Sequence, residues 1–204
     1  SKPTGRDYSP ELIAVDERSG IVVVPYRNGL EAFRTAGGEP HWETAGVSQQ
    51  QLTPAIHDGT VYTVGRIDGT DSLAAIDLED GTIRWTRALA NPSTSADPVV
   101  TERGVFVVDG NTLAIHDRRT GNRNSAISPF EAGESFTTTV AVDRGTAFVA
   151  NEEELLALDI EAGTTRWRHD NDVYAQGLSV GSETVIAMVD GSEYVSTERQ
   201  ETIT

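Results

Sequence analysis

The sequence predicts an all-β protein built from repeated four-stranded antiparallel sheets, and three observations indicate this fold class. A glycine-centred motif recurs at Gly38, Gly81, Gly121 and Gly163, at intervals of 43, 40 and 42 residues. A separate strand-and-turn signature precedes each copy in the same phase. No segment carries the i, i+3, i+4, i+7 apolar spacing of an amphipathic helix. Because two independent signatures repeat together, the chain is interpreted as an array of one structural unit.

The second repeat shows the expected strands of this unit most clearly. Its short β-prone runs cover residues 53–57, 60–66, 72–77 and 83–87. Turn residues separate them, such as Asp58-Gly59 after the first run. Glycine supplies positive φ at such corners, and aspartate caps the turn through its own backbone. Four short strands in about 42 residues are typical of one blade of a β-propeller.

The alignment divides the chain into four complete repeats and a partial one. Their approximate bounds are 10–52, 53–95, 96–136, 137–176 and, for the partial fifth, 177–204. We therefore expect a single β-propeller domain over residues 1–204, with about five blades. Two arrangements stay open. In a closed five-bladed ring, the residues before Pro10 complete the last sheet. An arc of a larger propeller would instead expose an apolar blade face, which favours self-association.

Charge is the most unusual feature of the composition. The 204 residues include 16 Lys and Arg against 32 Asp and Glu, for a formal charge of −16, and Lys2 is the only lysine. This acidity argues against binding to nucleic-acid phosphates. Most of the acids fall in expected hairpin turns, which indicates a coat around the scaffold rather than a patch. The excess acids repel one another and oppose the compact state in dilute buffer. In molar salt this repulsion is screened while the protein stays soluble, so the composition resembles that of proteins from salt-accumulating halophiles.

The repeated motif reads Ala-x-Asp-x-x-x-Gly-x-x-x-Trp and resembles the tryptophan-docking repeat of the pyrroloquinoline-quinone-like β-propellers. The matching residues are Ala32, Gly38, Trp42, Ala75, Asp77, Gly81, Trp85, Asp117, Gly121, Ala157, Asp159, Gly163 and Trp167. The resemblance implies that the tryptophans pack between blades. Two positions depart from the motif: Arg34 replaces the aspartate of the first repeat, and Ser125 replaces the tryptophan of the third. We expect the junction at Ser125 to be the weakest, or to be filled from elsewhere.

Quinone-dependent catalysis is not expected, although some members of this family are dehydrogenases. The resemblance implies that those enzymes hold a quinone beside a calcium ion, covered by adjacent cysteines, in about eight blades. This chain has no cysteine, no carboxylate-and-amide cluster that maps onto that calcium site, and at most five repeats. We therefore predict no catalytic, cofactor-binding or metal-binding residue.

Other possible sites are interpreted as structural. Residues 177–181 match the G-x-S-x-G nucleophile pattern in letters only, because no helix is expected after them. Residues 68–71 and 109–111 are interpreted as turns rather than calcium loops. The four histidines, which lack metal-ligand spacing, are expected to lie at the surface or pack between strands: His41, His57, His116 and His169.

Because the repeats carry no recognisable catalytic group, we expect a non-catalytic scaffold for protein interaction. The acidic composition indicates that it comes from a halophilic archaeon. The alternative is a propeller that binds a small ligand or cofactor, as a sensor or a degenerate quinoprotein-like oxidoreductase. No apolar run approaches the 18 residues of a membrane span, so no transmembrane segment is expected. The family resemblance favours an extracellular or cell-surface location, although a cytoplasmic one is also compatible with the sequence. The protein partner is unknown.

Overall fold

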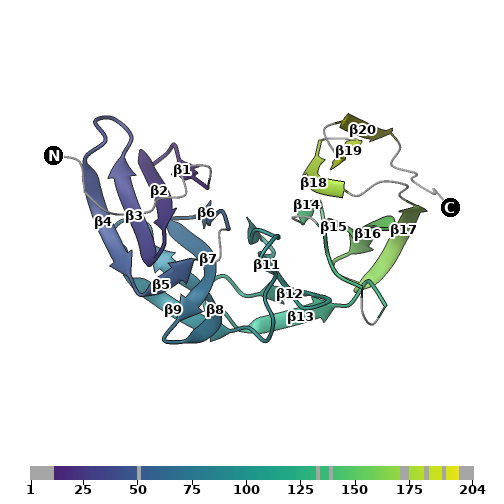
Figure 1. Ribbon diagram of the computed structural model, residues 1–204, viewed down its shortest axis with the longest axis horizontal. Helices are drawn as coiled ribbons and strands as arrows, with labels where there is room; N and C mark the ends of the chain where they lie inside the picture. Colours follow the sequence, from purple (N-terminus) through teal and green to yellow (C-terminus); the bar gives the residue numbers. More distant parts are fainter. Residues whose placement is uncertain are drawn as a thin grey trace. The chain divides into compact units, whose positions relative to one another are not determined.

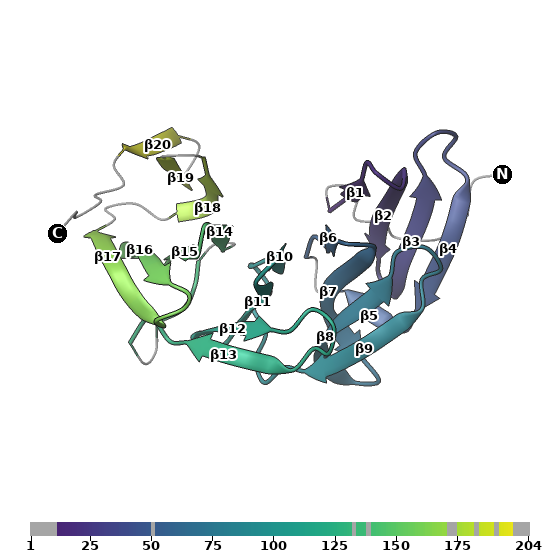
Figure 2. The same ribbon diagram turned by 180° about the vertical axis from the view of Figure 1, so that it is seen from behind.

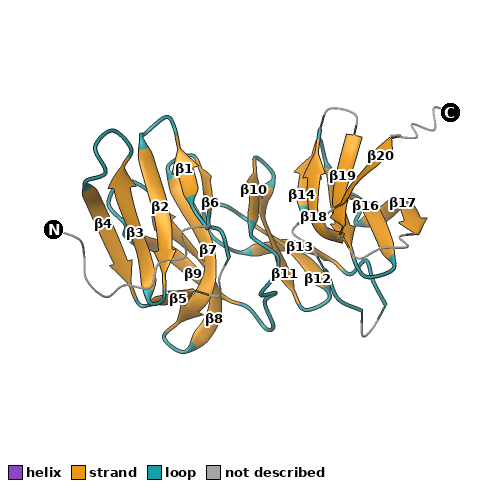
Figure 3. Cartoon of the chain, turned by 45° about the horizontal axis from the view of Figure 1, so that its top comes forward, coloured by secondary structure: helices purple, strands orange, loops and turns teal. Residues whose placement is uncertain are grey.

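The computed structural model describes residues 12–49, 52–131, 134–137, 140–170, 175–181, 184–189 and 192–197. These residues form strands and turns, without a helix among them (Figure 3). The part of the chain that the structure describes thus contains no helix that could cross a membrane. The N-terminal residues that would complete a closed ring lie outside the described residues.

The first sheet has the strand order β1-β2-β3-β4, and all its pairings are antiparallel (Figure 1). Its strands are β1 (Ala14–Asp16), β2 (Ile21–Tyr26), β3 (Gly29–Arg34) and β4 (Pro40–Ala45).

The second sheet has the order β5-β7-β8-β9, and β6 pairs with β7 as well (Figure 2). Its strands are β5 (Val47–Gln49), β6 (Ala55–His57), β7 (Thr60–Ile67), β8 (Thr70–Asp77) and β9 (Ile83–Ala88). The four expected strands of this repeat are present within a few residues of their predicted bounds. The sequence did not predict β5, which pairs with the last residues of the long strand β7.

The remaining sheets follow the same plan. The third has the order β10-β11-β12-β13 and comprises β10 (Val99–Thr101), β11 (Gly104–Asp109), β12 (Thr112–His116) and β13 (Arg123–Ile127). The fourth comprises β14 (Ala141–Asp143), β15 (Thr146–Ala150), β16 (Glu154–Asp159) and β17 (Thr164–Asp170). The fifth has three strands, β18 (Ala175–Val180), β19 (Thr184–Val189) and β20 (Ser192–Thr197). Five such sheets confirm the predicted all-β propeller class.

The chain divides into two compact units. The first comprises Ser1–Gly110 and Ala114–Ser125, and the second comprises Asn111–Leu113 and Ala126–Thr204. One boundary therefore falls directly after Ser125, the residue that replaces a motif tryptophan. Closure of all repeats into one domain over 1–204 stays a prediction.

In the first unit, the second sheet is buried on both faces. Alternate residues of a strand point to opposite faces, and in β8 Ala74 and Ile76 belong to one apolar cluster whereas Leu73 and Ala75 belong to another. The first cluster includes residues of the first sheet, and the second includes Val105 and Val107 of β11. Burial on both faces explains why the sequence of this strand is nearly continuously apolar.

In the second unit, the fourth and fifth sheets share one apolar cluster. It contains Phe148 and Leu155 of the fourth sheet and Val185 of β19. Trp167 packs against this cluster, and its ring lies 6.0 Å from that of Phe148. Each unit thus has its own hydrophobic core.

Candidate functional site

The motif tryptophans of the first two repeats dock on the next repeat. The Trp42 indole donates a hydrogen bond of 2.7 Å to the Leu78 carbonyl, and its ring covers Gly81 so closely that a Cβ there would lie 2.7 Å from Cε3. Trp85 covers Gly121 in the same way and donates a 3.1 Å hydrogen bond to the Arg118 carbonyl. In these repeats the tryptophan joins neighbouring sheets.

The other motif residues shape the strands and turns around these joints. Each motif alanine is buried and pairs across the sheet with the tryptophan of its own repeat, and each pair is followed by a β-bulge; the pairs are Ala32–Trp42, Ala75–Trp85 and Ala157–Trp167. The aspartates cap the next turn. The Asp117 carboxylate, for example, accepts hydrogen bonds from the Thr120 side chain and backbone, which lower the pKa of Asp117.

A group of charged side chains gathers beside the Trp85 joint, on two hairpin turns of consecutive repeats. β6 joins β7 through Asp58 and Gly59, and β10 joins β11 through Glu102 and Arg103. Asp58 and Gly59 have φ values of 45° and 67°, the left-handed pair that suits a tight hairpin. Both turns occupy the same position in their repeats, although Glu102 and Arg103 lack the positive φ of Asp58 and Gly59.

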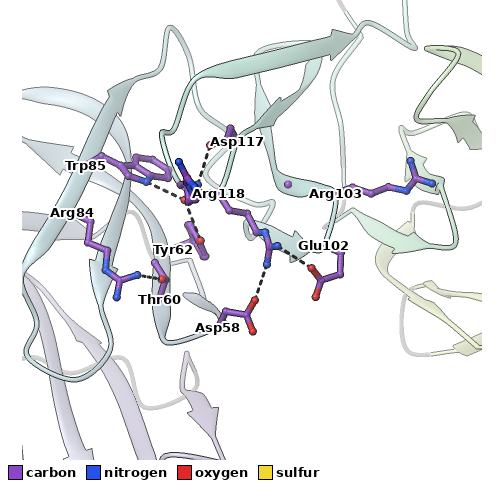
Figure 4. A pocket seen from close by; sticks show the side chains of 11 residues that line it. Asp58, Thr60, Tyr62, Arg84, Trp85, Glu102, Arg103, Asp117 and Arg118 are labelled. Atoms are coloured by element: carbon purple, nitrogen blue, oxygen red, sulfur yellow. Dashed lines mark hydrogen bonds and ion pairs between the residues drawn. The ribbon is translucent and has the colours of Figure 1, made fainter.

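Arg118 bridges the two turns. Its Nη1 lies 3.2 Å from Asp58 Oδ2 and its Nη2 lies 2.9 Å from Glu102 Oε2, as Figure 4 shows. The backbone of the arginine is fixed by the preceding repeat, because its carbonyl accepts hydrogen bonds from Trp85 and, at 3.3 Å, from the Tyr62 hydroxyl. The blade joint therefore positions the ion-paired guanidinium.

These residues line an open cavity of about 440 Å³ within the first unit (Figure 4). Four arginines and three acids line it: Arg84, Arg103, Arg118, Arg119, Asp58, Glu102 and Asp117. In a chain of charge −16, this is a local excess of positive charge. The side chains of Arg103 and Arg119 are exposed and make no hydrogen bond or ion pair with any described residue.

The apolar wall of the cavity is formed by Tyr62 and Trp85, whose ring centroids lie 6.0 Å apart. Burial raises the pKa of Tyr62. The Arg84 guanidinium donates hydrogen bonds to the Thr60 hydroxyl and, at 2.6 Å, to Asp77 Oδ2. The hydrogen bond from Arg84 to Asp77 lowers the pKa of Asp77. The cavity can therefore ion-pair and hydrogen-bond a ligand against an aromatic surface.

Of the motif residues, Trp85 and Asp117 line this cavity, whereas the sequence did not indicate the other charged residues that line it. On the sequence, Asp58 and Glu102 are members of the acidic coat, and His57 is expected to lie at the surface or pack between strands. The aligned repeats carried the missing signal. Turns at equivalent positions of adjacent blades lie side by side, so residues 57–58 and 102 could have been expected to meet.

The model of one protein family, described as outer membrane protein assembly factor BamB, matches residues 4–128 and again residues 109–203. The two matches together span nearly the whole chain. No curated protein matches the sequence.

Solved structures share the fold at low sequence identity. BamB from Moraxella catarrhalis superposes with a TM-score of 0.69 at 16% identity, over 92% of this chain and 64% of that one. Quinohemoprotein alcohol dehydrogenase from Comamonas testosteroni superposes with a TM-score of 0.69 at 16% identity, over 91% of this chain and 40% of that one. The Pan2 WD40 domain of Neurospora crassa superposes with a TM-score of 0.70 at 12% identity, over 91% of this chain and 60% of that one. The chain thus spans less than two thirds of each of these structures.

Proposed function

Because the chain belongs to the BamB family of pyrroloquinoline-quinone-like repeat propellers, we propose that it is a non-catalytic scaffold that binds another protein. The family match over both parts of the chain carries this proposal. The family's namesake is by description an assembly factor for proteins, which supports a binding role rather than a chemical one.

The arginine-lined cavity is the surface that we assign to partner binding. Arg103 and Arg119 are exposed and unpaired among the described residues, and the half-buried Trp85 ring, backed by the buried Tyr62, offers aromatic surface beside them. Arginine forks pair bidentately with carboxylates, and aromatic and arginine side chains dominate binding energy at protein interfaces. The surface therefore suits an acidic segment of a partner that also carries an apolar side chain.

The same cavity supports a role without catalysis. Its two turn carboxylates, Asp58 and Glu102, are both engaged by the Arg118 guanidinium. These ion pairs give both carboxylates a structural partner on the cavity wall, which supports a binding role for the cavity.

The decisive experiment compares partner capture by matched charge variants. The double variant Arg103→Glu/Arg119→Glu alters the cavity, and Arg27→Glu/Arg123→Glu makes the same charge change at exposed arginines outside it. Captured proteins from the native proteome are quantified by mass spectrometry. We expect a defined set that the wild type and the control retain and that the cavity variant loses by about tenfold or more, since interface hot spots are worth at least about 2 kcal/mol.

Two results would overturn this proposal. Equal capture by the cavity variant would remove the cavity as the binding surface. A turnover activity that disappears when a cavity residue is changed would replace the scaffold with an enzyme.

We further propose that the chain comes from a halophilic archaeon and works at the cell surface. The composition supports the first part, because the chain has 32 acidic residues and only 16 Lys and Arg, of which a single one is lysine. The family resemblance supports the second part, and immunolocalisation on intact and permeabilised cells tests it. Staining only after permeabilisation would contradict a surface location.

Salt dependence of stability tests the halophilic origin. The unfolding temperature should rise between about 0.1 M and about 1 M KCl, because the Debye length falls from about 10 Å to about 3 Å and repulsion among the acids is screened. Thermal unfolding followed by circular dichroism measures this. A midpoint that is constant or falls with added salt would reject salt adaptation.

A further inference from the structure

Three metal-ligating side chains meet at the edge of the two hairpin turns. The Nε2 atom of His57 lies 3.3 Å from Asp58 Oδ2 and 3.3 Å from Glu102 Oε1. One ligand atom from each residue lies within 4.8 Å of the other two. This is the one such group of three among the described residues.

The His57 ring nitrogen has no hydrogen bond that would explain its position. Nε2 is buried, yet it makes no hydrogen bond to any described residue, although two carboxylate oxygens lie 3.3 Å away. A ring N–H would therefore lie along neither N···O line. Leaving a buried polar atom unsatisfied costs about 1–3 kcal/mol. His41 and His116 also have an unsatisfied buried Nε2, but among these three histidines His57 is the one beside two carboxylates.

The spacing fits a tetrahedral cation better than it fits an N–H donor. Zinc binds histidine nitrogen and carboxylate oxygen at about 2.0–2.2 Å in a tetrahedron, which separates the ligand atoms by about 3.3 Å. Both N···O distances from His57 have this value. The chain has no cysteine, so imidazole and carboxylate are the ligands it can offer.

Arg118 holds Glu102 from its other side, whereas on Asp58 it contacts Oδ2, the same oxygen that lies beside His57. It binds Glu102 through Oε2, whereas Oε1 of the same carboxylate faces His57. The guanidinium thus orients Glu102, as outer hydrogen-bond partners commonly orient metal ligands. Its positive charge also opposes a cation nearby, so the affinity should be moderate.

We propose that His57, Asp58 and Glu102 bind one Zn²⁺ ion, with the fourth coordination position open to water or to a side chain of a partner. This departs from the sequence-based expectation that the chain has no metal-binding residue and that the histidines lie at the surface or pack between strands. The proposal does not depend on the scaffold function, because it rests on the geometry of these three side chains alone.

His41 provides a matched control. Its Nε2 is also buried without a hydrogen bond, and its side chain is 19% exposed against 23% for His57. It approaches a single carboxylate, Glu79 Oε1 at 3.6 Å. The two histidines therefore differ chiefly in the number of carboxylates beside them.

The test is a calorimetric titration of the full chain with Zn²⁺, in about 1 M KCl with excess Mg²⁺ to suppress weak binding to surface acids. The wild type and His41→Gln should each bind one ion. His57→Gln and Glu102→Gln should weaken binding by at least about tenfold, since even outer-shell partners contribute 10- to 100-fold.

Two results of this titration would overturn the proposed zinc site. Absence of saturable one-to-one binding in the wild type, or unchanged binding in His57→Gln, would leave His57 as an ordinary partner of two acids. Glu102 lies on an exposed turn, so Glu102→Gln should keep the fold and separate lost ligation from unfolding; circular dichroism checks this in each variant.

Discussion

The four motif glycines share one backbone conformation but differ in what covers them. Gly38, Gly81, Gly121 and Gly163 all have φ between 68° and 75°. The rings of Trp42 and Trp85 cover Gly81 and Gly121, whereas no described atom lies within 4 Å of a Cβ built on Gly38 or Gly163. The repeat before Gly163 has Ser125 at its tryptophan position.

This difference separates two reasons why the motif position is a glycine: the backbone conformation of the turn and the space needed by an indole ring. The positive φ closes the turn after the third strand of every repeat, where the glycine N–H bonds the carbonyl four residues earlier. The missing side chain makes room for an indole in two repeats only. Glycine is therefore required for the turn at all four positions, and for packing only at Gly81 and Gly121.

The largest expected effect comes from adding a single methyl group at these positions. Gly38→Ala and Gly163→Ala should cost about 1–2 kcal/mol each, the penalty of a left-handed non-glycine residue. Gly81→Ala should cost about 1–3 kcal/mol more, because its Cβ would overlap the Trp42 ring. Urea unfolding of each variant measures the difference.

A double variant shows whether the indole is the cause. In a Trp42→Ala background, most of the extra cost of Gly81→Ala over Gly38→Ala should disappear, and the remainder should come from Thr44 Oγ1, which would lie 2.9 Å from the added Cβ. The comparison fails if Gly81→Ala and Gly38→Ala destabilise the wild type equally, or if the full extra cost persists without Trp42.

A smaller effect distinguishes the first motif turn from the later ones. Asp77 has a lowered pKa because of its hydrogen bonds with Arg84, whereas Arg34 occupies the same position in the first repeat. A lowered pKa in the folded state stabilises the protein above the unfolded pKa of about 3.9, and this contribution is lost as pH falls through the folded pKa. Asp77→Asn should therefore cost about 0.2–1 kcal/mol at pH 7.

The same variant should become equal to the wild type in acid. Once Asp77 is protonated, it no longer pairs as an anion with Arg84, and asparagine can still accept the Glu79 N–H that Asp77 Oδ1 accepts. Denaturant unfolding at neutral pH and near pH 2 checks this. A penalty that is unchanged in acid would show that turn geometry, rather than charge, explains the loss.

The repeat pattern predicted the fold well because each blade repeats local chemistry. Turn residues such as Asp58-Gly59 and apolar runs such as that of β8 are visible within a few residues of sequence. The strand β5 was not visible, because Val47–Gln49 is short and depends on the extension of β7 to Ile67. The β-bulge after each motif alanine likewise arises from pairing with the next strand.

The charged site was harder to predict, because it combines three separate turns from two consecutive repeats. Asp58, Glu102 and Arg118 are each ordinary surface residues in the sequence, and none belongs to the motif. The hydrogen bonds from Trp85 and Tyr62 to the Arg118 carbonyl fix the backbone from which the guanidinium reaches the two acids. Aligning turns across repeats predicts which residues become neighbours, but not how their side chains pair.

The tryptophan–glycine joint has a direction along the chain. Each joint uses an indole from one repeat and a bare turn from the following repeat, so its two surfaces are different and complementary, as in a head-to-tail assembly. Any repeat that carries both surfaces can be copied and inserted between two others without redesigning either neighbour. Propellers of this kind can therefore lengthen by gene duplication one blade at a time, and substitution at one tryptophan position, as at Ser125, alters one joint while the others keep theirs.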